Sequence, residues 1–232
     1  MKKFILTHKD IKPIEGFEII DNRENSELDH RIWSEMAGLQ ILYNKLTTEK
    51  GENGMLLYDE NEFISLNHYR RMIDPDCVNR FYIPQPIVFN GSLAEQYAEC
   101  HSIEDLKLCG KSLKEEFPHL APVFEKTMND RMLIPYIICV LTVGQFKDYF
   151  NFLYKVLTNF NKKLGTNTYE ERLDYIRRHP ELYTGENKNS EPEYQARIES
   201  FLAERLATTY FNVCSQRTLV FPCKIIKTEG AF

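Results

Sequence analysis

The segment from Phe63 to Arg71 carries the side chains best suited to binding a phosphate. It reads Phe-Ile-Ser-Leu-Asn-His-Tyr-Arg-Arg, so a short apolar run leads directly into polar and cationic groups that begin at Asn67. A buried strand with this pattern would deliver them to the carboxyl end of a sheet, where open α/β folds bind ligands. Arg70 and Arg71 suit a diphosphate because each guanidinium donates two parallel hydrogen bonds. His68 could donate to the same phosphate or act as an acid.

Asp74 and Asp76 offer a second way to neutralise a diphosphate. Two carboxylates separated by one residue can hold a divalent cation, Mg²⁺ or Mn²⁺, that bridges to the phosphates. Two simpler interpretations remain open. Asp-Pro often begins a turn, and both carboxylates could pair with Arg70 and Arg71 at the surface.

Thr7, His8 and Lys9 follow the first apolar run of the chain. The end of a first strand is a second position where nucleotides rest in α/β folds. We expect these residues to line a nucleotide pocket, and a surface turn is the alternative.

Two glutamates in predicted helices are further candidates. Glu35 could recognise a ligand, although an exposed helix carboxylate is the simpler interpretation. Glu204 lies within the apolar helical sequence 201–206, where an ionised side chain is costly unless it has a partner. It is therefore either in a structural ion pair with Arg205 or an active-site carboxylate.

Apolar periodicity predicts strands that alternate with helices. Short apolar runs predict strands at 3–7, 17–20, 63–66 and 137–141, and prolines make 82–89 extended rather than helical. Spacings of three and four predict helices at 28–46, 93–107, 145–164 and 196–210, and a strand-like tail follows at 218–227. Gly165 provides a well-defined end for the third of these helices. This order indicates an α/β sheet with a helical C-terminal half.

Composition narrows the class of protein. The 232 residues are 43% hydrophobic, enough for one sizeable core. A formal net charge of −5 disfavours a nucleic-acid partner, which calls for a basic face. We find neither a signal-peptide pattern nor an apolar run long enough to span a bilayer, and the six cysteines lack Cys-x-x-Cys spacing. We therefore expect a cytoplasmic protein with reduced cysteines and at most peripheral membrane association.

The run from Ser65 to Arg71 resembles the His-Tyr-Arg-Arg signature of a bacterial family long catalogued as a domain of unknown function. Its members are commonly described as capsular or exopolysaccharide glycosyltransferases. Four further blocks resemble the family in the same order. They are the strand end at 7–9, the acidic helix at 33–39, the middle segment at 96–106, and the C-terminal helices at 146–150 and 201–206.

This resemblance implies a GT-A-like fold, with a Rossmann-like mixed sheet and a helical C-terminal half. It implies a single domain over 1–232, in which about 1–130 would bind a nucleotide sugar and about 131–232 would bind the acceptor. The expected activity is sugar transfer from a nucleoside-diphosphate donor to a surface-glycan or lipid-linked acceptor. Glu204 would be the general base, and His68 would assist. The alternatives are an inactive nucleotide-sugar binding protein and a non-enzymatic interaction domain.

Overall fold

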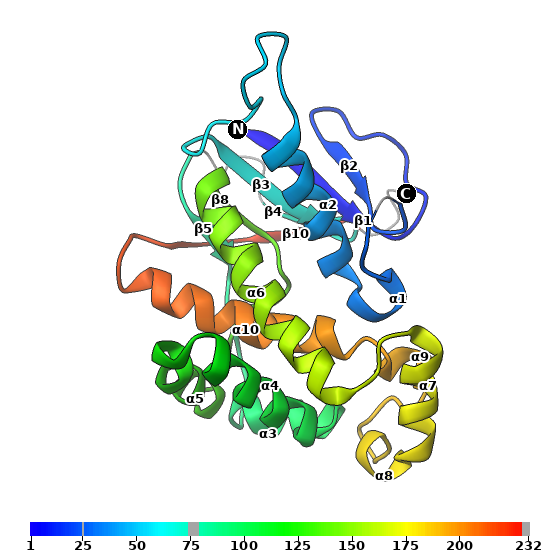
Figure 1. Ribbon diagram of the computed structural model, residues 1–232. Helices are drawn as coiled ribbons and strands as arrows, with labels where there is room; N and C mark the ends of the chain where they lie inside the picture. The colour runs from blue at the N-terminus through cyan, green and yellow to red at the C-terminus, as the bar shows by residue number, and fades with distance from the viewer. Residues whose placement is uncertain (25, 74–78, 229–232) are drawn as a thin grey trace.

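The protein consists of a sheet half and a helical half, and the long helix α10 lies between them (Figure 1). The computed structural model describes residues 1–24, 26–73 and 79–228. The strands are β1 (Lys2–Thr7), β2 (Glu18–Asp21), β3 (Phe63–His68), β4 (Arg71–Ile73), β5 (Tyr82–Pro84), β6 (Ile87–Val88), β7 (Met132–Leu133), β8 (Cys139–Thr142), β9 (Phe221–Cys223) and β10 (Ile225–Lys227). The helices are α1 (His30–Trp33), α2 (Glu35–Thr48), α3 (Leu93–Cys100), α4 (Ile103–Glu116), α5 (Ala121–Asn129), α6 (Val143–Leu164), α7 (Tyr169–Arg178), α8 (Pro180–Tyr183), α9 (Pro192–Gln195) and α10 (Ile198–Ser215), with a 3-10 turn at Pro118–Leu120.

The main sheet is mixed, and eight of the described strands form it. Strand β1 lies parallel to β2 and β3, so the carboxyl ends of these strands point to the same edge of the sheet. Strand β3 is antiparallel to β8 and, at its last residue, to β4. Strands β5 and β9 extend the sheet beyond β8, β10 pairs with β4, and β6 and β7 form a separate pair. The predicted mixed α/β sheet is therefore present.

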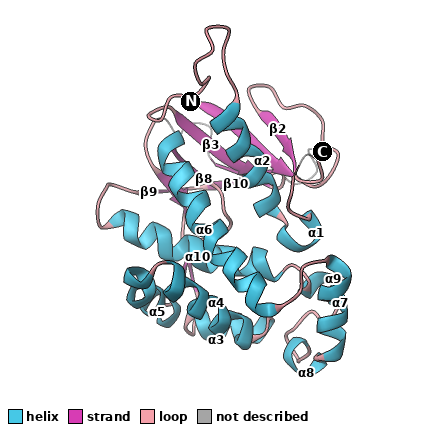
Figure 2. Ribbon diagram, viewed as in Figure 1, coloured by secondary structure: helices cyan, strands magenta, loops and turns pink. Residues whose placement is uncertain are grey.

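Helices α2 and α6 cover one face of this sheet, and the shorter helices gather in the other half (Figure 2). Helix α6 begins with a capping box at Thr142 and Gln145 and ends at Gly165, whose φ of 75° is the left-handed conformation that glycine favours. Its apolar stripe, including Phe146, Tyr149 and Leu153, is fully buried in the core. Across the described residues, every helix is too short or too polar to cross a bilayer.

Two predicted helices are each broken into two. The helix predicted at 28–46 is interrupted at Ser34, whose φ of 47° and ψ of −121° are not helical. The helix predicted at 93–107 is interrupted at His101 and Ser102, which are extended. The first break places Glu35 at the beginning of α2. Periodicity missed both breaks because the apolar stripe continues across them.

Strand β3 is longer than predicted and ends at His68 instead of Leu66. After a two-residue turn, Arg71 begins β4, and residues 68 and 71 face each other as a pair in the sheet. The cationic segment is therefore a tight hairpin at the sheet edge, which holds the imidazole of His68 and the guanidinium of Arg71 close to each other.

Candidate active site

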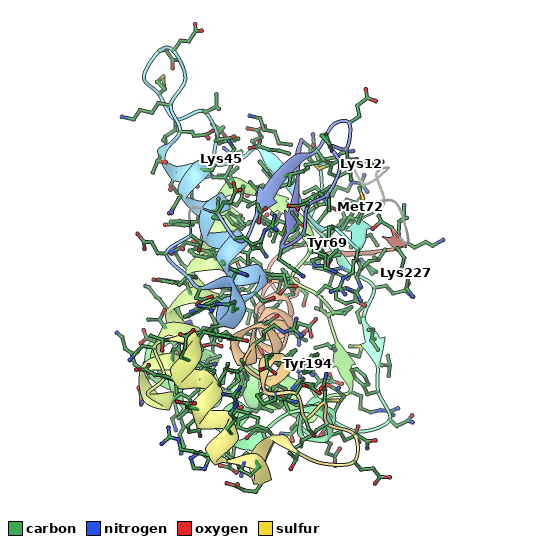
Figure 3. The ribbon with its side chains drawn as sticks, turned by 90° about the vertical axis from the view of Figure 1, so that its right-hand side faces the viewer. Lys12, Lys45, Tyr69, Met72, Tyr194 and Lys227 are labelled. Carbon is green, nitrogen blue, oxygen red and sulfur yellow. The ribbon has the colours of Figure 1, made fainter. Side chains whose placement is uncertain are left out.

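A cavity of about 50 Å³ lies between the carboxyl ends of β1 and β3 and the side of α10. Its lining combines one imidazole, one guanidinium and two carboxylates with apolar side chains. The residues are Leu6, Glu35, His68, Arg71, Tyr136, Ile137, Ile138, Ser200 and Glu204. This is the sheet edge at which open α/β folds bind ligands. In Figure 3, Tyr69, next to His68 in the chain, lies in the sheet half, and Tyr194, just before α10, lies in the helical half.

His68 offers an N–H donor beside this cavity. Its side chain is 7% exposed, and its Nδ1 accepts the backbone N–H of Arg70 at 3.2 Å, so a neutral ring carries its proton on Nε2. Burial lowers the pKa of His68 to about 4, which keeps the ring neutral at pH 7. Nε2 has no hydrogen-bond partner among the described residues, and the nearest carboxylate oxygen, Oε1 of Glu35, lies 3.6 Å away. A ligand oxygen in the cavity would complete its hydrogen bonding.

Glu35 stands at the positive end of α2, where the break at Ser34 places it. Its Oε2 accepts the hydroxyl hydrogen of Ser200 at 2.9 Å. Burial opposes ionisation of Glu35, whereas the positive charge of a protonated His68 and the hydrogen bonds to the carboxylate favour it, and its pKa lies below the ordinary value. The side chain of Glu35 is 21% exposed and lines the cavity, so its carboxylate is accessible to a ligand there.

Glu204 lines the cavity from α10. Its Oε1 accepts the backbone N–H of Tyr136 at 2.9 Å, and its Oε2 accepts from Nη1 of Arg205 at 3.2 Å. Tyr136 has a φ of 61°, an unfavourable conformation for a bulky residue, and the hydrogen bond to Glu204 helps to hold it. Burial raises the pKa of Glu204. Glu204 is thus both a partner of Arg205 and part of the cavity lining.

The two arginines of the hairpin have different surroundings. Arg71 lines the cavity, and its guanidinium lies 4.0 Å from the ring centre of Tyr136, a cation–π contact that orients it. Arg70 is exposed and lies 5.2 Å from the ring centre of Tyr69. Within the described residues, neither arginine takes part in a salt bridge.

Asn67 and Thr7 use their side chains within the protein. Nδ2 of Asn67 donates to the carbonyl oxygen of Phe4 at 3.1 Å, and its Oδ1 accepts the N–H of Ile73 at 2.9 Å, so it links β1, β3 and β4. Oγ1 of Thr7 donates to the carbonyl oxygen of Lys9 at 2.8 Å and accepts its N–H at 3.0 Å, which closes a turn. These side chains shape the sheet edge from which His68 projects.

His8 lines a second cavity of about 200 Å³ beside the first strand. Arg31 and Arg197 also line it, together with His30, Ser34, Tyr169 and Glu193. Nε2 of His8 is 3.4 Å from the hydroxyl of Tyr69, and burial lowers the pKa of His8. Lys9 is exposed. The structure therefore brings His68, Arg71 and Glu204 together and places His8 in a neighbouring cavity.

Asp74 and Asp76, the predicted metal ligands, lie outside the described residues. The described part of the chain contains no cluster of three or more His, Cys, Asp or Glu placed to hold a metal. The prediction of a Mg²⁺ or Mn²⁺ site at Asp74 and Asp76 stays a prediction.

Sequence reasoning overlooked Ser200 and Tyr136 and undervalued Glu35. Glu35 carried one usable signal, since it follows a serine at the beginning of a helix. Tyr136 and Ser200 carried none, because their roles come from a backbone conformation and from a contact across 165 positions of sequence.

The fold is similar to that of a solved glycosyltransferase. The apo structure of the bifunctional glycosyltransferase WbbM matches this chain with a TM-score of 0.67 at 12% identity. The match covers 99% of this chain and 45% of the WbbM chain, so the protein spans less than half the length of that enzyme. The predicted fold class is confirmed by this likeness.

The particular family follows from the sequence. The family model described as Domain of unknown function (DUF4422) matches residues 53–177, more than half of the chain, and the protein belongs to this family. The match includes the segment from Phe63 to Arg71 and ends before α10. No curated protein matches the sequence.

Proposed function

We propose that the protein is a glycosyltransferase that moves a sugar from a nucleoside diphosphate to a hydroxyl group of a surface-glycan or lipid-linked acceptor. The observation that carries this proposal is the meeting of Arg71, the neutral N–H of His68 and the carboxylates of Glu35 and Glu204 around one cavity. The glycosyltransferase-like fold supports the same function. The proposed setting is the cytoplasm, at the inner face of the membrane, without a nucleic-acid partner.

In this proposal Arg71 binds the diphosphate of the donor. Its guanidinium is charged, oriented by Tyr136 and free of salt bridges within the described residues, so it can stabilise the negative charge that develops on the leaving phosphate. Nε2–H of His68 donates to an oxygen of the same leaving group. Arg70, outside this cavity, and the turn at Thr7, His8 and Lys9 would hold the rest of the nucleotide.

Glu204 acts as the general base. It accepts the proton of the acceptor hydroxyl while that oxygen bonds to the anomeric carbon and the bond from this carbon to the phosphate oxygen breaks. Burial raises the pKa of Glu204, which strengthens it as a base. Glu35 is placed to accept hydrogen bonds from sugar hydroxyls. A divalent cation held by Asp74 or Asp76 would share the neutralisation of the diphosphate.

A second candidate function is nucleotide-sugar binding without transfer. It is favoured by the hydrogen bonds that already occupy both carboxylate oxygens of Glu204, through Tyr136 and Arg205. A third candidate, a non-enzymatic interaction domain, requires no ligand in the cavity at all.

A thermal-shift panel of nucleoside diphosphates and nucleotide sugars, with and without Mn²⁺, tests these candidates. A ligand at about one hundred times its dissociation constant stabilises a protein by about 2.7 kcal/mol. Transferase and binding protein both predict such a shift. If no nucleotide raises the melting temperature, both fail and the interaction domain remains.

Variants separate the roles. Arg71→Ala should weaken diphosphate binding about 10- to 100-fold, because a charge-assisted hydrogen bond contributes about 1.5–3 kcal/mol. Arg217→Ala is the matched control, since Arg217 is exposed and lies outside the cavity. Glu204→Gln should bind the donor but not transfer the sugar, as measured by release of the nucleoside diphosphate. Turnover by Glu204→Gln would remove Glu204 from the mechanism.

A further inference from the structure

A groove of about 240 Å³ runs beside the candidate active site, between the β4–β10 strands and the β6–β7 pair. It shares Arg71 and Tyr136 with the active-site cavity, so the two spaces adjoin. The remaining lining residues are Gln85, Ile87, Pro135, Lys224, Ile225 and Lys227.

The groove is cationic. Arg71, Lys224 and Lys227 contribute three positive charges, and the described residues that line the groove include no carboxylate. Both lysines are exposed, and the salt bridges of the described residues include neither of them. Figure 3 shows Lys227 at the margin of the sheet half. On a protein with a net charge of −5, such a local basic surface indicates an anionic partner.

An exposed apolar strip borders the same groove. Strands β6 and β7 pair at Val88 and Met132, which are 62% and 46% exposed. Ile87, 40% exposed, belongs both to this strip and to the wall of the groove. Exposed aliphatic side chains next to lysines match the interface of a membrane, where apolar groups enter the lipid and cations meet the headgroups.

We propose that the groove and the β6–β7 strip together form the surface by which the protein docks on an anionic lipid bilayer. The lysines contact phosphate-bearing headgroups, and Ile87, Val88 and Met132 enter the boundary between headgroups and acyl chains. A nucleic acid would contact the lysines but leave the apolar strip exposed to water. A free phosphate ion would leave the strip exposed as well.

Docking in this way has a consequence for the proposed function. Because Arg71 and Tyr136 lie in both spaces, the active-site cavity opens next to the bilayer. An acceptor anchored in the lipid could then reach the cavity without leaving the membrane. The docking surface itself rests on the charge and exposure of its residues and does not require the transferase activity.

Sedimentation with lipid vesicles tests the docking surface. The full chain should pellet with vesicles that contain phosphatidylglycerol and remain in solution with vesicles of phosphatidylcholine alone. Each lysine near an anionic surface contributes about fivefold to binding, so Lys224→Ala with Lys227→Ala should weaken binding about 30-fold. Val88→Ser with Met132→Ser should also weaken it, and this loss should persist at high salt, where the electrostatic part is screened.

Lys111→Ala with Lys114→Ala, both exposed on α4, is the matched control and should bind as the unchanged protein does. The proposal is overturned if the unchanged protein ignores phosphatidylglycerol vesicles, or if removing Lys224 and Lys227 has no greater effect than this control. Soluble glycerophosphate that prevents pelleting as effectively as an excess of unpelleted phosphatidylglycerol vesicles would also overturn it. A free headgroup would then be enough for binding. Pelleting without any nucleotide-induced thermal shift would refute the transferase and leave the docking surface standing.

Discussion

Replacing Asp105 by asparagine should stabilise the protein, and more so as the pH rises. Asp105 lies on α4, is 2% exposed, and receives the hydroxyl of Tyr183, 3.1 Å from each carboxyl oxygen. Burial raises its pKa from 3.8 to about 7, against the opposing effects of Tyr183 and Arg172. Asparagine has nearly the same shape, keeps an acceptor for Tyr183, and never needs to ionise.

The magnitude follows from the two pKa values. Between about pH 4 and pH 7 the folded chain holds a proton on Asp105 that the unfolded chain has lost, so this carboxyl makes the free energy of unfolding fall as pH rises. Below about pH 4 Asp105 is protonated in both states and imposes no penalty on folding. The penalty grows as the pH rises and is complete once the pH has passed 7. The penalty for Asp105 relative to a neutral side chain is about 2 kcal/mol at pH 5 and about 4 kcal/mol at pH 8.

Urea denaturation of the Asp105→Asn variant and of the unchanged protein at pH 5, 6, 7 and 8 measures the difference in their free energies of unfolding. Other titrating groups are present in both proteins and cancel in the comparison. Asp148→Asn, which replaces an exposed carboxyl on α6, is the control. A gap between Asp105→Asn and the unchanged protein that stays constant from pH 5 to 8 would refute the reasoning. A less stable variant at pH 8 would do so too.

Three further predictions concern packing and protonation. Arg172→Met should lower the free energy of unfolding, measured with urea, by about 3–5 kcal/mol, because the fully buried carboxylate of Glu199 loses its two hydrogen bonds of 2.8 and 2.7 Å. Adding Glu199→Met to the same chain should restore most of this loss, and a double variant as unstable as the single one would contradict the cause. Gly38→Ala should cost about 1–3 kcal/mol, since the added methyl group would overlap Oδ1 of Asn22, and an unchanged melting temperature would show that Asn22 moves freely. Nitrogen chemical shifts should show His68 as the neutral Nε2–H tautomer from pH 6 to 8, because its pKa is about 4; a titration midpoint near 6.5 would contradict the burial argument.

Much of the fold was predictable because it depends on local periodicity. The strands at the beginning of the chain and at Phe63, and the long helix that ends at Gly165, were predicted to within a few residues. In each of them the apolar spacing agrees with the burial that the structure shows. The breaks at Ser34 and at His101 were missed, because the apolar pattern continues across both of them.

The helices at 121–129 and 169–178 were not predicted at all. Helix α7 places Arg172 in the core, where it binds Glu199 and thereby fixes the beginning of α10. A charged residue inside an apolar helix pattern weakens the periodic signal, although here the charge is buried and paired. The partner that makes this burial possible lies 27 positions away.

By itself, the sequence determined which segment would bring an imidazole and two guanidinium groups to the edge of the sheet, because an apolar strand leads directly into His68, Arg70 and Arg71. Only the tertiary structure decided which of them meet in a cavity. Arg71 and Glu204 both line the cavity, and Arg70 is exposed outside it. The physical reason is that Glu35 meets Ser200 across 165 positions, and Glu204 meets Tyr136 across 68. Contacts at such separations form when helices dock on the sheet, and residue spacing along the chain contains no record of them.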